Sequence, residues 1–327
     1  MNKHPFYGWV QLEQPRLGGK VTFASDEFFA AKERIIDPAE PVFIAGKFDD
    51  HGKWMDGWES RRKRTPGHDF CIVRLGMPGV IRGLDIDTSH FSGNFPPEVS
   101  IDGCVSDDDV PEDGWVTLLP KFPIEGNSHN YVPLQNDDSW SHLRVNIYPD
   151  GGIARLRVFG EVRPALGNAS DLIDLAALKH GGRVLSASDE HFGSMHNLNL
   201  PGRGVNMGDG WETARRRGPG HDWAIVALAA PGTIERIEVD TAHFKGNYPD
   251  RVSFDAAYFA SNDGADNVSG AWRPLLGECK LAMDQQHYFE QGIQPLGVVS
   301  HVRMCIYPDG GVSRLRLFGR PAMEKPA

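Results

Sequence analysis

The stretch Asp56-Gly57-Trp58-Glu59, followed by Pro66-Gly67-His68-Asp69, occurs twice in this chain. Its second occurrence is Asp209-Gly210-Trp211-Glu212, followed by Pro219-Gly220-His221-Asp222. An arginine-rich run lies between the two tetrapeptides in both copies. Because many of the repeated residues are polar and chemically capable, the repeat indicates a duplicated functional region as well as a duplicated fold.

Further blocks recur on both sides of this stretch. In first-copy and second-copy order they are Ala24-Ser25-Asp26-Glu27 and Ala187-Ser188-Asp189-Glu190, Asp87-Thr88-Ser89-His90 and Asp240-Thr241-Ala242-His243, and Tyr148-Pro149-Asp150-Gly151-Gly152 and Tyr307-Pro308-Asp309-Gly310-Gly311. The spacing between copies changes only between blocks, as loop insertions between packed segments would change it. A chain of 327 residues corresponds to about two domains of about 150 residues each. We therefore predict two copies of one domain, at residues 1–164 and 165–327, with the seam in the turn-rich stretch 164–170.

Composition places the chain among ordinary globular proteins, with 40% hydrophobic and 24% charged residues. No stretch approaches the roughly 20 apolar residues of a membrane span, and residues 1–10 lack the pattern of a signal peptide. The four cysteines form no C-x-x-C pair, so we expect a reduced, cytoplasmic protein. A net charge of −10 argues against nucleic acid as the main partner, because a binding surface for phosphates must be basic.

The local pattern is mostly typical of β-strands. Residues 71–75, 80–87 and 143–148 are rich in β-branched residues and partly alternating. In the last of these, Leu143 and Val145 share one face and Arg144 the other. Turn residues separate the segments, and alternation resumes after Pro149-Asp150-Gly151-Gly152 as a return strand.

One helix is indicated, over residues 171–180. Ser170 could cap it, Leu172, Leu175 and Leu178 lie near one face, and Gly181 ends the run. A parallel α/β domain would need a helix after nearly every strand, and those are missing. The sequence therefore predicts an all-β protein of two tandem β-sandwich or jelly-roll domains.

Repeated polar residues fall at strand ends and in loops. Asp87 would end a strand and open the loop that carries His90, and Asp240 and His243 repeat this arrangement. The loop at residues 56–69, like its second copy, closes immediately before a strand. Because sandwich loops cluster at the two ends of a domain, loops at the same end would gather carboxylates, arginines and histidines around one cleft in each copy.

Structural alternatives stay open for several of these residues. Trp58 and Trp211 are more typical of a core or cap position than of a ligand platform. His68-Asp69 and His221-Asp222 could be structural hydrogen-bonded pairs. Ligation of a divalent cation by His68, His90 and their Asp neighbours is open, although no spacing typical of a zinc site is present. No other cofactor is indicated.

At these residues the chain resembles the allantoicase family. In the first copy the resemblance rests on the run from Trp54-Met55-Asp56-Gly57-Trp58-Glu59-Ser60-Arg61-Arg62 to Pro66-Gly67-His68-Asp69, and on Asp85-Ile86-Asp87-Thr88-Ser89-His90-Phe91-Ser92-Gly93-Asn94. The second copy, from Gly181-Gly182-Arg183-Val184 to Tyr307-Pro308-Asp309-Gly310-Gly311, is similar to the second repeat of that family. The resemblance implies two galactose-binding-like (discoidin-like) jelly rolls and the hydrolysis of allantoate to ureidoglycolate and urea in purine breakdown. The segment from Phe192 to Asp209 is shorter than its first-copy counterpart from Phe29 to Asp56, so the two clefts are expected to differ.

The chemistry of allantoate fits the repeated residue types. Its carboxylate calls for the planar fork of arginine, its ureido groups for carboxylates and amides, and its departing nitrogen for a general acid such as histidine. The candidate catalytic residues are His68, Asp69, Asp87, His90, His221, Asp222, Asp240 and His243. The candidate substrate-binding residues are Asp56, Glu59, Arg62, Arg64, Asn94, Asp209, Glu212, Arg215, Arg217 and Asn247.

Two other functions stay open on the sequence. A discoidin-like sandwich can be a ligand-binding module without catalysis, because a fold does not fix a function. The substrate could also be another ureido acid, such as ureidoglycolate. The loops are dense in His, Asp, Glu and Arg rather than in exposed aromatic residues, which favours the enzyme. We expect a small-molecule substrate, no nucleic-acid or membrane partner, and a homo-oligomer with closed symmetry.

Overall fold

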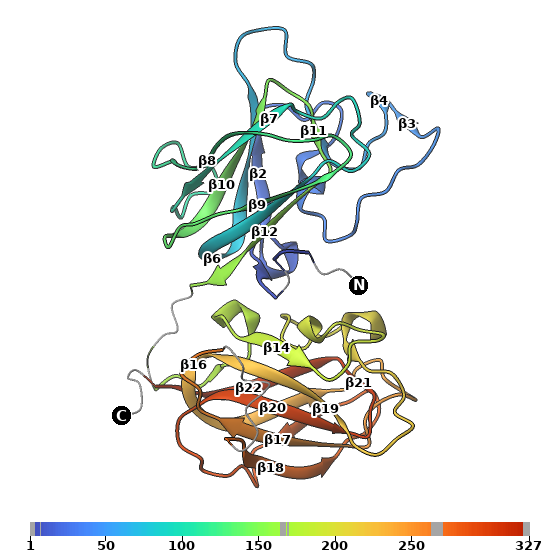
Figure 1. Cartoon of the computed structure of the whole chain (residues 1–327), viewed down its shortest axis with the longest axis vertical. Helices are drawn as coiled ribbons and strands as arrows, with labels where there is room; N and C mark the ends of the chain where they lie inside the picture. The colour runs from blue at the N-terminus through green and yellow to red at the C-terminus, as the bar shows by residue number, and fades with distance from the viewer. Residues whose placement is uncertain (1–3, 7, 164–167, 169, 263–270, 323–327) are drawn as a thin grey trace. The chain divides into compact units, whose positions relative to one another are not determined.

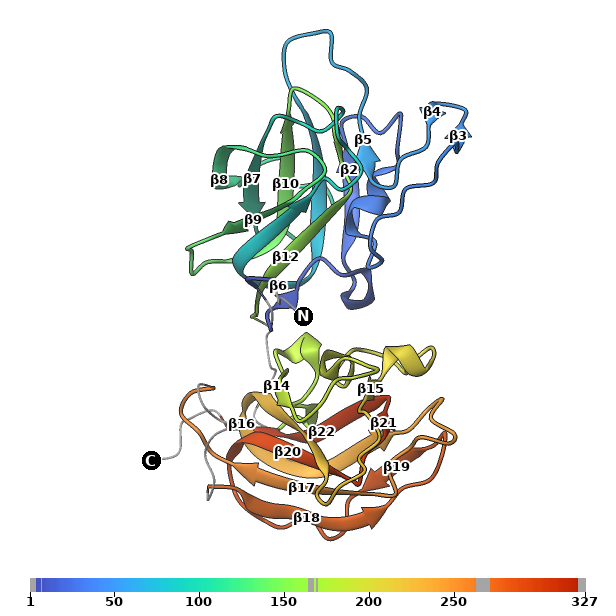
Figure 2. The same ribbon diagram turned by 45° about the vertical axis from the view of Figure 1, so that its right-hand side comes forward.

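The computed structural model describes residues 4–6, 8–163, 168, 170–262 and 271–322. The chain divides into two compact units, residues 1–164 and 165–327, which Figures 1 and 2 show from two sides. Each unit is a jelly-roll β-sandwich, as predicted. The first has the strand order β1-β12-β6-β10-β7-β8, and the second has the matching order β13-β22-β16-β20-β17-β18. Most of the expected seam, residues 164–167 and 169, lies outside the described residues.

The elements of the two units correspond closely in order and length. In the first unit they are β1 (Val10–Gln11), η1 (Pro15–Leu17), β2 (Lys20–Ala24), η2 (Lys32–Ile36), β3 (Phe48–Asp49), β4 (Gly52–Lys53), β5 (Trp58–Glu59), β6 (Asp69–Asp87), β7 (Glu98–Cys104), β8 (Val116–Pro123), β9 (His129–Pro133), β10 (Ser139–Tyr148), β11 (Gly152–Ile153) and β12 (Arg155–Val162). In the second unit they are β13 (Ile173–Asp174), η3 (Leu178–His180), β14 (Arg183–Ala187), η4 (Met195–Asn197), η5 (Met207–Asp209), β15 (Trp211–Glu212), β16 (Asp222–Asp240), β17 (Arg251–Ala257), β18 (Arg273–Lys280), β19 (Gln286–Phe289), β20 (Val299–Tyr307), β21 (Gly311–Val312) and β22 (Arg314–Pro321).

The long strand β6 brings the repeated loops to one end of the first domain. Its residues 69–74 pair with β2 and β10, whereas residues 79–87 pair mainly with β9 and β12, so the chain changes direction between them. The amide of Asp69 donates to the carbonyl of Pro149 over 3.1 Å, and the amide of Ala154 donates to the carbonyl of Asp87 over 2.8 Å. Because both ends of β6 bond to the short connection between β10 and β12, the loops before and after β6 lie side by side.

Alternating strands supply the core, as the sequence pattern predicts. Leu143, Val145 and Ile147 of β10 are fully buried. Trp58 is also fully buried, and its indole N–H donates to the carbonyl of Asp26 over 2.8 Å. Trp211 makes the same bond to Asp189, so the structural interpretation of these tryptophans is confirmed.

The predicted helix over residues 171–180 is wrong. Residues 173–174 form β13, which pairs with β22, and residues 178–180 form the 3₁₀ helix η3. Leu175 and Leu178 are buried while Leu172 stays 42% exposed, so the three leucines do not share the single buried face of a helix. Pairing at the sheet edge overrides the local helical preference. No helix of the described residues is long and apolar enough to cross a membrane.

Candidate functional site at the loop end of each domain

Three repeated blocks meet at the loop end of the first domain. The side-chain amide of Asn94 donates to Glu59 Oε1 over 2.8 Å, and the Asn94 carbonyl accepts from the amide of Gly152 over 2.8 Å. The amide of Ser60 donates to the carbonyl of Gly151 over 3.1 Å. Gly151 has φ of 140°, and a Cβ there would lie 2.7 Å from the backbone nitrogen of Pro96, so only glycine fits this close approach.

The second domain repeats every one of these contacts. Asn247 donates to Glu212 Oε1, and its carbonyl accepts from the amide of Gly311 over 2.7 Å. The amide of Thr213 donates to the carbonyl of Gly310 over 3.2 Å. The structure therefore brings together the predicted substrate-binding residues Glu59 and Asn94 in one domain and Glu212 and Asn247 in the other.

The basic run is anchored by its middle residue. Lys63 donates from its backbone to Asp150 Oδ2 over 2.7 Å and from its ammonium group to the buried Asp69 Oδ1 over 2.6 Å. Arg216 makes the equivalent contacts with Asp309 and Asp222. Asp69 and Asp222, predicted as catalytic, thus hold the run in place. In an extended segment the flanking residues point the other way, and Arg62, Arg64, Arg215 and Arg217 are exposed.

A cleft of about 570 Å³ opens at this end of the second domain. Its lining includes Glu212, Arg215 and Asn247, all predicted from the sequence, together with Arg216 and Asp309. The cleft therefore offers a guanidinium group, a carboxylate and a side-chain amide to one small molecule.

The corresponding carboxylate of the first domain is partly desolvated. Burial raises the pKa of Glu59, although the hydrogen bond from Asn94 and the charge of Lys53 act in the opposite direction. A carboxyl group with a raised pKa can hold a proton closer to neutral pH and release it to a substrate.

Asp56 and Asp209 form buried ion pairs. Asp56 Oδ2 lies 2.9 Å from Arg155 Nη2, and Asp209 Oδ2 lies 2.8 Å from Arg314 Nη2. Both arginines are about 1% exposed. The two aspartates, predicted to bind substrate, are therefore committed to charged partners within their own domains.

The Asp56–Arg155 pair holds a segment that we call the clamped segment, residues 37–42. Arg155 donates to the carbonyl of Ala39 over 2.8 Å, Arg157 donates to the carbonyl of Asp37 over 2.6 Å, and the amide of Val42 donates to Asp56 Oδ2 over 2.9 Å. In the second domain, residues 200–205 are held in the same way by Arg314, Arg316 and Asp209.

The histidines predicted as catalytic are divided between two places. His90 and His243 lie against the clamped segments, with Nε2 3.2 Å from the carbonyl oxygen of Pro41 and 2.9 Å from that of Gly204. His68 lies instead on the outer face of the sheet, with Nε2 3.2 Å from Asn146 Oδ1 and its ring against Tyr148. His221 stacks on Tyr307 in the same manner.

The surroundings of His68 form a shallow cavity of about 460 Å³. Asp102 at its base accepts hydrogen bonds from Arg144, Asn146 and Thr117, each over 2.9 Å. The carboxylate of Asp102 is thus fully engaged within the domain. The sequence pattern placed Arg144 on the face opposite Leu143 and Val145 but did not indicate its partner.

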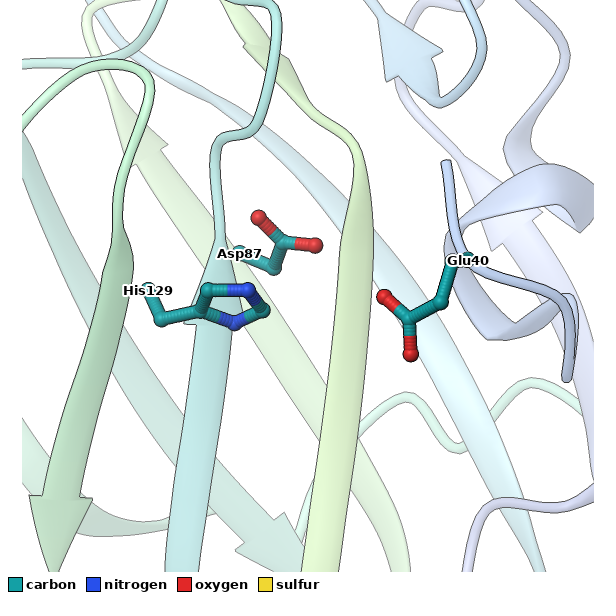
Figure 3. A group of neighbouring side chains, drawn as sticks. All are labelled: Glu40, Asp87 and His129. Atoms are coloured by element: carbon teal, nitrogen blue, oxygen red, sulfur yellow. The ribbon is translucent and has the colours of Figure 1, made fainter. Parts of the chain in front are cut away.

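A second group of ionisable residues lies where β6 and β9 end, in the first domain. Asp87 is buried and its Oδ1 accepts from the amide of Ser89 over 2.8 Å, whereas the ring of His90 lies against Pro41. Asp87 is instead grouped with His129 of β9 and Glu40 of the clamped segment, each offering one atom within 4.8 Å of the others. Figure 3 shows the Asp87 and His129 side chains next to each other, with Glu40 reaching toward them from a separate segment.

Asp85 completes this group. Its Oδ2 lies 2.8 Å from His129 Nδ1. Burial raises the pKa of Asp85, against the opposing effect of His129. Burial lowers the pKa of His129, but its hydrogen bond to Asp85 and the nearby charges of Asp85, Asp87 and Glu40 raise it overall.

Comparison with known proteins agrees with the duplicated architecture. The Allantoicase family model, described as the allantoicase repeat, matches residues 10–163 and again residues 173–322. The chain belongs to the allantoicase family. A protein named probable allantoicase 2 from Burkholderia pseudomallei is 59% identical over 320 residues, covering 96% of this chain and 95% of that protein. A probable allantoicase from Pseudomonas aeruginosa is 53% identical over 325 residues, covering 98% of each.

A solved allantoicase has the same fold. The crystal structure of allantoicase from Saccharomyces cerevisiae superposes with a TM-score of 0.79 at 38% identity, covering 95% of this chain and 92% of that one. The likeness spans both allantoicase repeats.

Two residues of the group around Asp87 were missed from the sequence. Glu40 and His129 lie in segments where the two allantoicase repeats differ, because Arg203 and Gln286 stand in the corresponding places. A search for repeated letters cannot find residues of this kind. Their signal is the strand register, which sets His129 opposite Asp87.

Proposed function

We propose that this protein hydrolyses allantoate to ureidoglycolate and urea, a step of purine degradation through allantoin. Membership of the allantoicase family over nearly the whole chain carries the proposal. The loop-end residues support it, because they supply the guanidinium, carboxylate and amide groups that allantoate requires.

The loop-end cleft is the proposed substrate site. Arg215 is exposed at its edge and would bind the carboxylate of allantoate as a two-pronged donor. Glu212 would accept from ureido N–H groups, and Asn247 would donate to a ureido carbonyl once substrate displaces part of its present bond to Glu212. Arg62, Glu59 and Asn94 would do the same in the first domain.

The proposed reaction breaks one bond between the central carbon and a ureido nitrogen. Water supplies the hydroxyl group that stays on the carbon, giving ureidoglycolate, and one proton that leaves with the nitrogen as urea. Glu59, whose pKa burial raises, is placed to pass this proton to the departing nitrogen. Such proton transfer by a positioned group typically contributes about 10²- to 10⁴-fold.

Assembly and compartment are part of the same proposal. We expect a closed homo-oligomer in the cytoplasm, as is common for metabolic enzymes. Size-exclusion chromatography with light scattering measures the number of chains per particle, and fractionation of the producing cells locates the protein.

The direct test incubates purified protein with allantoate and measures urea and ureidoglycolate together. Equal release of both products is expected, because one C–N bond breaks per turnover. A matched reaction with ureidoglycolate as the only substrate is the control. Turnover of ureidoglycolate alone would reassign the substrate, and turnover of neither would favour a ligand-binding role.

Replacing Arg215 with Lys tests carboxylate binding. Lysine keeps the positive charge but loses the two-pronged geometry, so the KM for allantoate should rise about tenfold, which corresponds to about 1.4 kcal/mol. Arg62→Lys should behave alike, and Arg251→Lys, which changes an exposed arginine paired with Glu278, is the control. An unchanged KM in the double variant Arg62→Lys/Arg215→Lys would remove both arginines from the site.

A further inference from the structure

We propose that the first domain contains a divalent-cation site formed by Glu40, Asp87 and His129, with Asp85 supporting the histidine. The three ligand atoms lie within 4.8 Å of one another, so binding of one ion at the usual bond length of about 2.0–2.2 Å requires rotation of these side chains toward it. The cluster combines carboxylates with an imidazole, a set that suits first-row ions such as Mn²⁺ and Zn²⁺. Figure 3 shows that the three residues converge from three separate parts of the chain.

The hydrogen bonding of His129 is that of a metal ligand. Asp85 Oδ2 lies 2.8 Å from His129 Nδ1, which leaves Nε2 for an ion. Histidines that bind metals usually donate their second N–H to a carboxylate in this way. The other oxygen of Asp85 is buried and has no hydrogen-bond partner among the described residues, so the carboxylate group is not fully satisfied by the protein itself.

In the second domain, a side-chain cation occupies the position that corresponds to the proposed ion. Arg203 stands where Glu40 stands in the first domain, and its Nε and Nη2 donate to the two oxygens of Asp240 over 2.8 and 3.0 Å. Gln286 stands in the place of His129, and its amide donates to Glu238 Oε1 over 2.8 Å. A fixed side-chain cation therefore neutralises the strand-end carboxylate of the second domain.

The backbone around Glu40 and around Arg203 is held in the same way, so the two domains differ in the side chains at these positions. Both clamped segments are held by the same kind of contacts, from Arg155 and Arg157 in the first domain and from Arg314 and Arg316 in the second. Arg157 and its counterpart Arg316 both bind backbone carbonyls, so neither explains why the strand-end clusters of the two domains differ in charge. Where the second domain has an internal cation and an amide, the first domain has a third carboxylate and an imidazole. An external divalent cation restores the charge balance.

The test measures ion binding and needs no substrate, so its outcome is independent of the proposed function. Protein freed of metal with a chelator and then dialysed is titrated with MnCl₂ and, separately, with ZnCl₂. Binding is followed by isothermal calorimetry, by the electron paramagnetic resonance of Mn²⁺, and by the melting temperature, which a ligand of the folded state raises. One ion per chain is expected.

Two variants convert the first site toward the second. Glu40→Arg places a side-chain cation at an exposed position and should abolish binding, while His129→Gln should weaken it at least tenfold. Glu238→Gln, which removes a carboxylate from the corresponding strand of the second domain, is the matched control and should bind as the unaltered protein does. Circular dichroism of each variant before titration verifies folding.

The result that overturns the proposal is equally specific. Absence of binding by the unaltered protein with either ion at millimolar concentration would do so. So would equal binding by Glu40→Arg and the unaltered protein, or loss of binding in Glu238→Gln comparable to that in Glu40→Arg.

Discussion

Glu13 shows how a single buried carboxyl group can make stability depend on pH. It is fully buried, and its Oε2 accepts from the amide of Val158 over 2.9 Å. Burial raises its pKa to about 7, although the bond from Val158 and the charge of Arg157 act in the opposite direction. Asp174 has the same role in the second domain, accepting from the amide of Leu317, and burial raises its pKa as well.

We predict that Glu13→Gln makes stability less dependent on pH. The folded protein keeps the Glu13 proton to higher pH than the unfolded chain, whose pKa is about 4.3. The stability from this group is therefore complete below that value and is lost as pH rises through about 7, by a few kcal/mol at most. Urea unfolding at pH 5 and pH 8 measures the change. An unaltered slope of unfolding free energy against pH in Glu13→Gln would contradict the assignment.

Residue patterns predicted part of the candidate site and missed the rest for a physical reason. Glu59 and Asn94 could be found because they recur in polar blocks on both sides of one strand. Lys63 could have been found from alternation, since an extended run that points Arg62 and Arg64 outward turns its middle residue inward. His129 could not, because its role depends on a strand register that no local pattern encodes.

At the scale of elements, β-strand periodicity and turn chemistry predicted most of the architecture. The strands over residues 71–75, 80–87 and 143–148 are present, but the first two are parts of the single long strand β6. Gly76, Pro78 and Gly79 mark the change of direction within β6 in the sequence, but the partners on either side of it, β2, β9 and β12, depend on long-range pairing. That change of direction places the repeated loops together.

The clamped segment is an element that depends on His90. The His90 backbone has φ of 71°, which few residues other than glycine and asparagine accept readily. We predict that His90→Asn keeps this conformation, loses the contact with Pro41 and increases hydrogen exchange in residues 37–42. Mass spectrometry of exchanged peptides measures it.

His243→Asn is the matched change, and it should increase exchange in residues 200–205 only. Equal protection of residues 37–42 in His90→Asn and the unaltered protein would show that the remaining contacts of the segment suffice without the histidine. A fall in kcat with unchanged exchange would instead support the direct catalytic role that the sequence suggested.

At the scale of the whole molecule, the two domains share one set of contacts and differ in another. The Glu–Asn pair and the anchored basic run recur in both domains. The strand-end clusters differ, with Glu40 and His129 in one domain and Arg203 and Gln286 in the other. The longer first-copy segment also contains the additional hairpin of β3 and β4, which projects from its domain in Figure 2.

The preserved contacts predict that both domains are active. Glu59→Gln should remove the proposed proton donor from the first site only, so turnover per chain should fall to about half. Glu212→Gln, at the corresponding position of the second domain, should lower turnover to a similar extent. The double variant should retain only the residual activity of groups that bind substrate. Steady-state rates of urea release measure each variant, and an unchanged melting temperature verifies that the fold is intact. If one single variant abolishes turnover while the other leaves it unaltered, only the domain with the essential glutamate is active. The segments that differ between the domains, rather than the shared Glu–Asn pairs, would then decide which domain catalyses.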